Sequence, residues 1–488
     1  IPKAFVGILP SVDKGIPNGC YREADAMAEK QINREDFRTA GSIWSDCAER
    51  PAFQRLKTDL KTDVLVIGGG MAGLLCAYML DRAGVDYVLV EADTIGRGIT
   101  ENTTAKITSQ HGLIYHKLVK EFGMEKAAMY LHANEDALSR YKDLCRGIDC
   151  DLEERDAFVY SLKDTREMED ELDTLGKLHF PSEFVKHPPL PFPVAGAVRF
   201  ADQAQFNPIK FIRGIAGGLN IYEHTRVREL AEGKAMTDAG TVTADHMIVA
   251  THFPFINKHG SYFLKMYQHR SYVIALEHGP DLKGMYVDAA PAGLSLRNYK
   301  DLLLVGGGGH RTGKTGGNWE ELRRFASDHY PDVRECCRWA AQDCMTLDHV
   351  PYIGRYSRRT RGLLVAAGFN KWGMTSSMVS AMVLTDMVMG KKNPYEAVFS
   401  PSRTMLRPQL AANGLEAAKN LLTLSTPRCP HMGCALKWNK TEHSWDCPCH
   451  GSRFDGDGHL IDNPATGDLV KQVRTPPVRP ADGGGVCI

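Results

Sequence analysis

The sequence predicts an α/β protein that carries a small all-β module near its C-terminal end. An apolar strand, a glycine-rich turn, a helix and a second strand follow one another between Asp63 and Glu91. Short apolar segments separated by glycine turns fill the region 192–310, which is typical of a mixed sheet. A cluster of cysteine and histidine lies apart from both, at 429–450. The expected parts are a nucleotide-binding domain, a sheet domain and a metal-binding module.

Composition narrows the class of protein. The chain has 488 residues, a length that fits about three domains at roughly 150 residues each. Hydrophobic residues make up 43% and charged residues 24%, which excludes a disordered or collagen-like chain. Lys and Arg number 59 and so do Asp and Glu, so nothing favours a nucleic-acid partner. Charged residues or glycine break the longest apolar stretches before the ~18 residues that a membrane span needs, and Val64–Leu80 comes nearest.

The N-terminal residues and the cysteines indicate the compartment. Residues 1–20 hold no basic region followed by an apolar core, so we expect no secretory signal. The 13 cysteines are too sparse for a disulfide framework, and four of them lie within Cys429–Cys449 beside histidines. That pattern favours a metal site in a cytoplasmic protein.

The first strand–helix–strand unit predicts a Rossmann-like dinucleotide site. The strand Asp63–Ile67 runs directly into the turn Gly68–Gly73, a helix over Leu74–Arg82 and a second strand over Tyr87–Glu91. In this context the first glycine of Gly-x-Gly-x-x-Gly permits the turn, the second lets a pyrophosphate approach, and the third lets the helix pack closely. The helix N-terminus favours phosphate, and Glu91 is placed to accept hydrogen bonds from ribose.

Several later segments have a clear predicted structure. Asp136–Leu175 is helical in character, and 192–250 holds short strands. The other expected elements are strands at Ser271–Leu276, Gly284–Val287, Leu302–Val305 and Gly362–Gly368, and helices at Trp319–Tyr330 and Met374–Met389. Gly306–Gly309 follows a strand but lacks the helix and acidic residue of a second dinucleotide site. We therefore expect a turn continuing as a loop there, and no NAD site.

The cysteine and histidine cluster has metal-ligand spacing. Cys429-x-His431 and Cys447-x-x-His450 are separated by fifteen residues. Zinc could use such a set, but each half also carries an extra cysteine, Cys434 or Cys449, beside glycine and proline.

This combination resembles the Rieske [2Fe–2S] module. The resemblance assigns Cys429 and Cys447 to one iron, and His431 and His450 to the other. It also implies a disulfide bond between the remaining pair of cysteines, Cys434 and Cys449. Asn463-Pro464-Ala465 matches the third loop that covers the cluster in this family.

Two departures from that family have consequences. Phe454 stands where high-potential members have tyrosine, so a hydrogen bond is missing and a lower potential is expected. Only Leu421–Thr426 is available as a strand before the first cysteine box, so the module should lean on its neighbour for burial. The resemblance also implies that the two histidines occupy an exposed tip, with one pointing to the cofactor of the nucleotide-binding domain or to an external carrier.

Residues 60–400 resemble the D-amino-acid-oxidase-like family of FAD oxidoreductases, the glycine and sarcosine oxidase superfamily. The resemblance lies in the loop Gly96–Lys106, in Pro351-Tyr352-Ile353-Gly354 and in Gly368–Thr375. It implies FAD, with the first loop beside the isoalloxazine ring and the last meeting the ring through a helix N-terminus. The residues expected to bind FAD are Gly68, Gly70, Gly73, Glu91, Gly98, Thr103, Thr104, Val227, Gly354, Gly368, Trp372, Gly373 and Met374.

The same resemblance implies a substrate domain over the flavin. Its groups able to hold an anionic or amine substrate are Tyr267, His269, Arg270, Tyr272, Arg297 and His310. The catalytic-site candidates are Lys106, His252, Arg270, Tyr272 and Lys371. Cys344 has the wrong offset for covalent attachment of flavin, so non-covalent FAD is expected. No catalytic base is nominated, because the family's amines lose hydride directly to flavin N5.

The expected organisation follows from these assignments. It comprises an N-terminal arm (1–59), an FAD domain in two parts (60–254, with insertions near 136–200, and 336–401), a substrate domain (255–335), a linker (402–423) and the Rieske domain (424–488). We expect hydride transfer from a small amine or amino acid to FAD, then single-electron transfer to the cluster and a one-electron carrier. The alternatives are inward flow, in which the cluster reduces the flavin, and an electron-transfer or redox-sensing protein without organic substrate.

Overall fold

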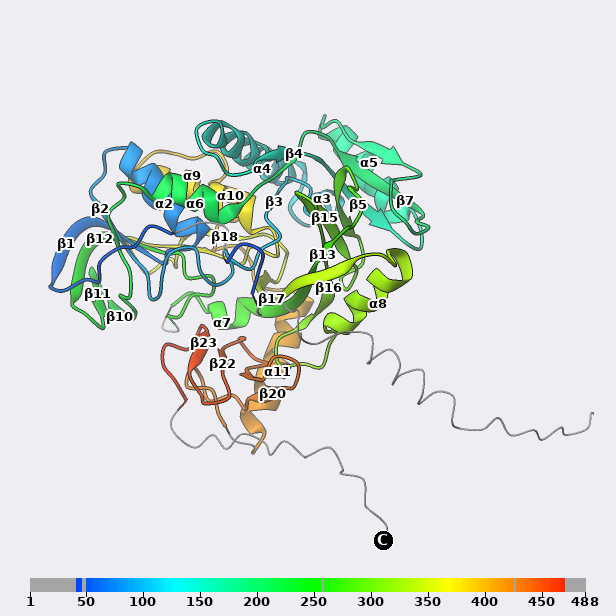
Figure 1. Cartoon of the computed structure of the whole chain (residues 1–488). Helices are drawn as coiled ribbons and strands as arrows, with labels where there is room; N and C mark the ends of the chain where they lie inside the picture. The colour runs from blue at the N-terminus through cyan, green and yellow to red at the C-terminus, as the bar shows by residue number, and fades with distance from the viewer. Residues whose placement is uncertain (1–40, 46–49, 257–258, 425–426, 470–488) are drawn as a thin grey trace, which may run out of the picture. The chain divides into compact units, whose positions relative to one another are not determined.

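The computed structural model describes residues 41–45, 50–256, 259–424 and 427–469 (Figure 1). Most of the predicted N-terminal arm and the end of the C-terminal module lie outside the described residues. Among those that are described, no helix is both long and apolar enough to cross a bilayer.

One sheet holds the predicted nucleotide-binding unit. Its order is β10-β11-β12-β1-β2-β9, and β19 continues it on β12 and pairs with β18. The central strand β1 is parallel to both β12 and β2, and its apolar residues are buried on both faces. Helices α2, α6 and α9 pack together on this sheet (Figure 1). The bounds are β1 Leu60–Ile67, α2 Met71–Arg82, β2 Tyr87–Val90, α6 Pro208–Ala216, β9 Ile221–Tyr222, β10 Val227–Ala231, β11 Lys234–Thr237, β12 Thr241–Val249, β18 Tyr352–Arg355, β19 Leu363–Ala367 and α9 Gly373–Val388.

A second, mixed sheet stands beside the first in the order β17-β13-β16-β15-β14-β5-β7-β6. Helix α8 packs on β13 and β16. The bounds are β5 Asp156–Ser161, β6 Glu183–Val185, β7 Gly196–Phe200, β13 Met266–Glu277, β14 Gly284–Asp288, β15 Ser295–Tyr299, β16 Leu302–Arg311, α8 Trp319–His329 and β17 Arg334–Thr346.

The second sheet differs from the sequence prediction in two ways. It takes in β5 to β7 and all of β17, so it extends beyond the predicted segment 255–335. The predicted turn at Gly306–Gly309 is instead part of β16. Glycine lets α8 pack closely on this strand, because a Cβ on Gly307 would lie 3.0 Å from Leu322 Cδ2 on α8.

The connections between the sheets are helical or short strands. The predicted helical stretch Asp136–Leu175 is interrupted by β4 and β5. The bounds are β3 Lys106–Ile107, α3 Tyr115–Phe122, α4 Met124–Cys145, β4 Glu153–Glu154, α5 Arg166–Lys177, β8 Ala204–Gln205, α7 Tyr262–Lys265 and α10 Glu396–Phe399.

The C-terminal module is a small antiparallel sheet, β20-β21-β22-β23, with its own apolar core around Trp445 and Phe454. Its strands are β20 Lys437–Asn439, β21 Ser444–Asp446, β22 Arg453–Phe454 and β23 Leu460–Asp462. Helix α11 (Pro408–Leu422) fills most of the predicted linker and takes up residues expected to form a strand. It holds the module through a hydrogen bond from the amide of Ala435 to the carbonyl of Asn420, 3.1 Å.

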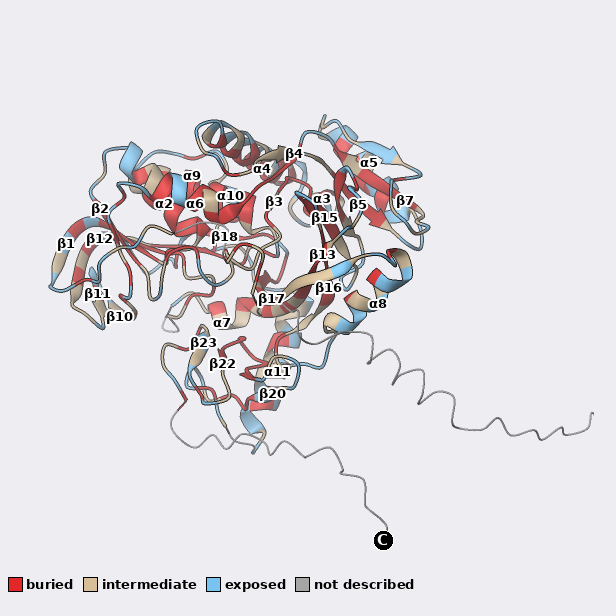
Figure 2. Cartoon of the chain, in the orientation of Figure 1, coloured by how far each residue is buried: buried red, intermediate tan, exposed pale blue. Residues whose placement is uncertain are grey.

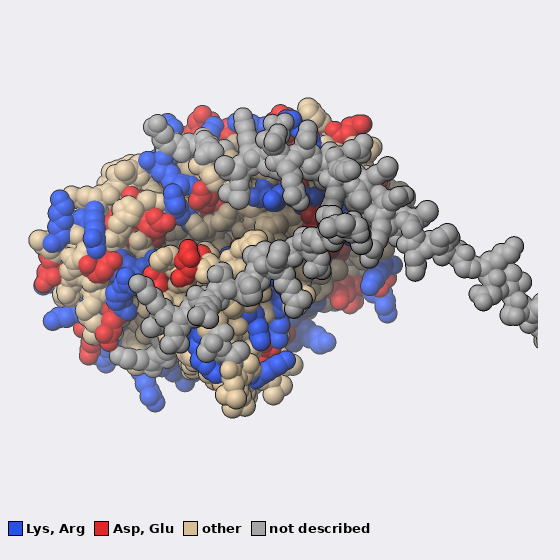
Figure 3. Space-filling view, turned by 60° about the horizontal axis from the view of Figure 1, so that its bottom comes forward, with Lys and Arg blue, Asp and Glu red and all other residues tan. Residues whose placement is uncertain are grey.

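Burial and charge follow the usual pattern of a folded chain. The buried residues concentrate in the first sheet, in α2 and α9, and along the middle of the second sheet (Figure 2). Basic and acidic side chains are interspersed over the described part of the face shown in Figure 3, in line with their equal totals.

Candidate functional site

A cavity of about 870 Å³ lies where the two sheets and the C-terminal module meet. Its wall includes the glycine turn after β1, the loop 97–104, strand β13 and the start of α9. The C-terminal module contributes Leu460, Ile461, Asp462, Asn463, Ala465 and Thr466. Segments distant in the sequence thus enclose one space.

The glycine turn has the geometry of a phosphate-binding turn. Gly68 has a φ of +110°, and a Cβ on it would lie 2.7 Å from the carbonyl oxygen of Ala250. A Cβ on Gly73 would lie 1.8 Å from the carbonyl oxygen of Gly68, so only glycine allows α2 to pack here. Gly70 lines the cavity at the N-terminus of α2. Backbone N–H groups at this end can therefore meet a phosphate.

Glu91 lies beside the turn and lines the cavity. Its carboxylate accepts hydrogen bonds from the amides of Gly69 (2.6 Å) and Asp93 (2.8 Å). Burial raises the pKa of Glu91, although these hydrogen bonds oppose the shift. The carboxylate therefore shapes the turn in addition to facing the predicted ribose position.

The threonine-rich loop is fixed from several sides. Thr100 Oγ1 accepts a hydrogen bond from the amide of Met71, 3.1 Å. Trp44 Nε1 donates to the carbonyl of Thr103, 2.7 Å. Arg297 is buried and donates to the carbonyl oxygens of Thr104 (2.5 Å) and Ala105 (3.0 Å). Arg297 thus supports the loop and does not line the cavity.

The N-terminus of α9 forms another part of the wall. Trp372 lines the cavity and stacks on His111, with ring centroids 4.9 Å apart. His111 Nδ1 lies 2.6 Å from Tyr130 Oη, and its Nε2 lies 3.0 Å from Thr375 Oγ1. Burial lowers the pKa of His111 to about 3, so the ring is neutral. Sequence reasoning missed His111, because Trp372 and Thr375, which contact its ring, are more than two hundred residues away in the chain.

Most predicted catalytic residues line the cavity: Lys106, His252, Tyr272 and Lys371. Lys106 donates to Ser295 Oγ, and burial together with the charge of Arg297 lowers its pKa to about 7. His252 Nε2 lies 3.1 Å from Gln268 Oε1.

Asp343 adds an acidic group that sequence reasoning did not single out. It lines the cavity on β17, and burial raises its pKa against the opposing charges of Lys371 and His252. Burial lowers the pKa of Lys371, and the charge of Asp343 opposes that shift. The wall therefore carries a lysine, an aspartate and a histidine whose charges interact.

Some predicted residues lie elsewhere. Ten of the predicted FAD residues line the cavity, whereas Gly73, Gly354 and Gly368 do not. Among the predicted substrate groups, Tyr267, His269 and Tyr272 line it, whereas Arg270, Arg297 and His310 do not. Cys344 is also outside the lining, and its Sγ contacts Met266 Sδ at 3.5 Å.

The predicted iron ligands come together in the C-terminal module. The thiols of Cys429 and Cys447 interact, and the rings of His431 and His450 lie 4.9 Å apart. The Sγ of Cys447 and a ring nitrogen of His450 lie within 4.8 Å of each other and of Cys434 Sγ. His450 Nδ1 is buried without a hydrogen-bond partner in the described part of the chain. Two thiols and an unpartnered imidazole nitrogen fit a Rieske [2Fe–2S] centre.

Two details at this centre differ from the simplest expectation. His450 is only 3% exposed, because the rings of Phe253 and Phe263 cover it, whereas an exposed tip was predicted. Cys434 and Cys449 are free thiols in this structure and interact with each other. Their disulfide bond stays a prediction.

The module docks beside the cavity through polar contacts. Asn463 Nδ2 donates to the carbonyl oxygens of Thr251 (2.6 Å) and Phe253 (2.9 Å). Gln342 Nε2 donates to the carbonyl of Gly451, 2.9 Å, next to His450.

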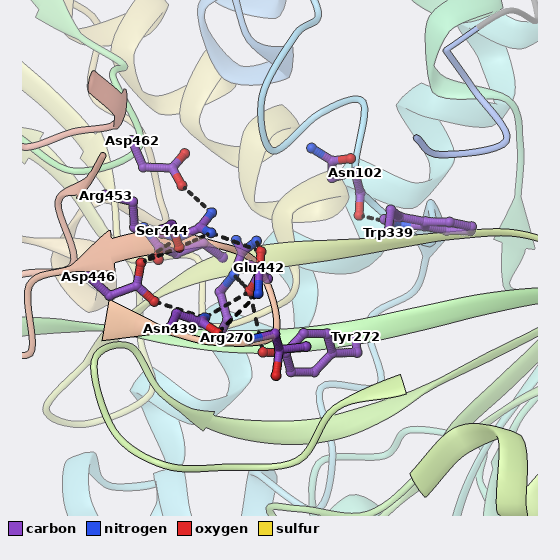
Figure 4. Close-up of polar contacts among 12 residues, drawn as sticks. Asn102, Arg270, Tyr272, Trp339, Asn439, Glu442, Ser444, Asp446, Arg453 and Asp462 are labelled. Atoms are coloured by element: carbon purple, nitrogen blue, oxygen red, sulfur yellow. Dashed lines mark hydrogen bonds and ion pairs between the residues drawn. The ribbon is translucent and has the colours of Figure 1, made fainter. Parts of the chain in front are cut away.

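A buried ion network, shown in Figure 4, joins the module to the second sheet. Arg270 donates through Nε to Glu442 Oε1 (2.9 Å) and also pairs with Oε2. Tyr272 Oη donates to the same carboxylate at 3.3 Å, and Arg453 Nη2 donates to it at 2.9 Å. Burial acts to raise the pKa of Glu442, but Arg270 and Arg453 outweigh it and lower the pKa to about 2. Arg270 therefore holds the C-terminal module on the second sheet. The sequence had predicted a substrate-binding role for this residue instead.

Comparison with known proteins identifies both parts. The family model for FAD dependent oxidoreductases matches residues 63–387, and that for the Rieske [2Fe-2S] domain matches residues 416–477. The chain is 33% identical to the putative Rieske 2Fe-2S iron-sulfur protein YhfW of Bacillus subtilis, over 92% of this chain and 99% of that protein.

Solved structures agree on the fold. Glycine oxidase from Geobacillus kaustophilus has a TM-score of 0.59 and 21% identity, covering 71% of this chain and 99% of its own. L-proline dehydrogenase from P. horikoshii has a TM-score of 0.60 and 17% identity, covering 71% and 98%. The predicted fold class and the two cofactors, FAD and a [2Fe–2S] cluster, are confirmed. The chain belongs to the FAD dependent oxidoreductase family and carries a C-terminal Rieske [2Fe-2S] domain.

Proposed function

We propose that the protein oxidises a small amine or amino acid at FAD and passes the electrons singly through the Rieske cluster to an external one-electron carrier. The observation that carries this proposal is the shared wall between the two cofactor sites. The Rieske domain lines the cavity itself, and Phe253, which follows the cavity-lining His252, contacts the iron ligand His450. Such closeness supports direct electron exchange between the two centres.

The groups around the cavity support the proposed substrate class. FAD supplies an acceptor for an electron pair as hydride, and the cluster supplies a one-electron relay. Lys106 and Lys371 can make charge-assisted hydrogen bonds to a carboxylate, and Tyr267 and His269 stand on the same wall. Glycine oxidase and L-proline dehydrogenase share this fold, so it accommodates amino-acid substrates.

An anaerobic screen tests the substrate and the direction of flow. The protein loaded with FAD and cluster is mixed with amines and amino acids, and flavin absorbance is followed without added reductant. Bleaching by one compound in stoichiometric amount is expected. If no amine bleaches the flavin but a reduced one-electron carrier does so through the cluster, electrons flow inward and the proposal fails.

A ligand variant tests the route. His450→Ala should leave substrate bleaching intact and abolish transfer to a one-electron acceptor, because an iron ligand is removed. His459→Ala is the matched control, since His459 lies exposed in the same domain and pairs with Asp468. If the His450 variant reduced the one-electron acceptor at the wild-type rate, the cluster would not lie on the electron-transfer route.

A further inference from the structure

Arg311 brings a positive charge from the second sheet to the loop that carries two predicted iron ligands. It is the last residue of β16. Its Nε donates to the carbonyl of Pro448 (3.2 Å) and its Nη2 to the carbonyl of Cys449 (3.3 Å). Both carbonyls belong to the short stretch between the ligands Cys447 and His450.

The guanidinium of Arg311 donates hydrogen bonds only to uncharged groups. The third hydrogen bond of the guanidinium goes from Nη1 to Asn413 Oδ1, 2.9 Å, so all three acceptors are uncharged. Among the described residues, no carboxylate forms an ion pair with Arg311. The carboxylate of Glu416 interacts with the charge of Arg311, but it forms its ion pair with Lys314, at 2.5 Å. The guanidinium is partly buried against the Tyr267 ring, 5.0 Å from its centroid, and stays protonated at neutral pH.

The charge of a Rieske cluster depends on its redox state. With two ferric irons, two sulfides, two thiolates and two neutral imidazoles the cluster is uncharged, and one added electron makes it an anion. A cation beside the ligand loop therefore interacts more favourably with the reduced state. Because the surroundings are partly desolvated, the interaction is screened less than at the surface.

We propose that Arg311 raises the reduction potential of the cluster by stabilising its reduced state, so that the second sheet sets the potential of the domain docked on it. This effect opposes the lower potential expected from Phe454. It concerns the cluster alone and holds whichever substrate the flavin takes, so its test is independent of the proposed function.

The test is a redox titration of the full chain loaded with FAD and cluster, with dithionite as reductant and the EPR signal of the reduced cluster as readout. Arg311→Gln should lower the equilibrium constant for cluster reduction about tenfold, which is about 59 mV for a one-electron couple. Arg311→Lys keeps the charge and should stay close to the wild type. Arg228→Gln is the matched control, because Arg228 also donates to a carbonyl of this domain, that of Thr466, but is exposed.

A second variant neutralises the charge without touching Arg311. Asn413→Asp places a carboxylate where Arg311 Nη1 already donates, on α11 and outside the Rieske sheet. It should lower the potential in the same direction, and it carries the test if Arg311→Gln does not retain the cluster. Unchanged potentials in both variants would overturn the proposal. So would a decrease in Arg311→Lys as large as in Arg311→Gln, since hydrogen bonding would then be the cause.

Discussion

At the scale of single residues, the cavity depends on glycine residues, because they lack the Cβ atom that would fill its space. Gly70 faces the cavity at the start of α2, and a Cβ there would already lie 3.3 Å from Thr100 Oγ1. Thr100 Oγ1 in turn accepts the hydrogen bond from Met71 that fixes the loop. Space for a pyrophosphate and the position of the threonine-rich loop are therefore coupled.

Gly70→Val should abolish FAD binding, because its methyl groups would occupy the space that the pyrophosphate needs. The measurement is flavin absorbance per chain after purification. Gly176→Val is the control, because a Cβ on Gly176, in α5, would meet no heavy atom within 4 Å. Full flavin content in the Gly70 variant would show that the cofactor does not pass this turn.

Lys106 should make substrate binding depend on pH. Burial and Arg297 lower its pKa from 10.5 to about 7, so it is charged below pH 7 and neutral above. If its ammonium holds a substrate carboxylate, affinity should fall by about tenfold as pH rises from 6 to 8, through loss of a charge-assisted hydrogen bond. Anaerobic flavin bleaching against substrate concentration gives the affinity.

Lys106→Arg keeps the charge over this range and should flatten the pH profile. Lys106→Met should bind the substrate at every pH from 6 to 8 with the weak affinity that the wild type has at pH 8. A profile for Lys106→Met that matches the wild type would exclude Lys106 from the pH dependence.

At the scale of elements, retention of the cluster depends on how the two ligand loops of the Rieske domain are held together. The free thiols of Cys434 and Cys449 interact across the two loops. We predict that they form a disulfide bond in the loaded protein. Cys434→Ser should then reduce retention of the cluster on dialysis against a chelator, measured as acid-labile sulfide per chain.

Cys336→Ser serves as the control, since Cys336 lies on β17 outside the Rieske domain. Mass spectrometry of the unreduced wild-type protein should show the linked peptides. Equal cluster retention in Cys434→Ser and in the wild type would contradict a disulfide bond that holds the two ligand loops together.

At the scale of the whole molecule, Glu442 is the buried ionic contact through which the Rieske domain docks on the second sheet. Its carboxylate is shared by Arg270 of the second sheet and Arg453 of the Rieske domain, and its side chain is 9% exposed. The pKa of Glu442 is lowered to about 2 from 4.5, so its contribution is complete above pH 4.5 and is lost as pH falls towards 2. Docking should therefore be insensitive to pH between 5 and 8.

Glu442→Gln should lower the stability of the docked domain by about 3–5 kcal/mol, because the buried guanidinium of Arg270 loses its counter-charge, whereas Arg453 keeps Asp446 and Asp462. Thermal loss of cluster absorbance measures the change. The control is Glu183→Gln, which breaks an exposed pair with Arg199 and should cost no more than about 1 kcal/mol. Equal melting of both variants would mean that docking does not use this network.

The sequence alone determined the parts whose chemistry depends on local spacing. Gly68, Glu91 and four candidate iron ligands were predicted from the sequence, because a turn, a strand end and a ligand loop each depend on neighbours a few residues away. The strands and helices around the glycine turn agree to within a few residues for the same reason.

Only the tertiary structure decided what the cationic and glycine-rich segments of the second sheet do. Arg270, Arg297 and Arg311 are alike in sequence, yet they hold the Rieske domain, the threonine-rich loop and the ligand loop. Gly306–Gly309 belongs to a strand because this part of β16 pairs with β13 and β15, and α8 packs on that strand. The roles of the three arginines depend on contacts between residues more than a hundred positions apart, and local periodicity and spacing carry no information about those contacts.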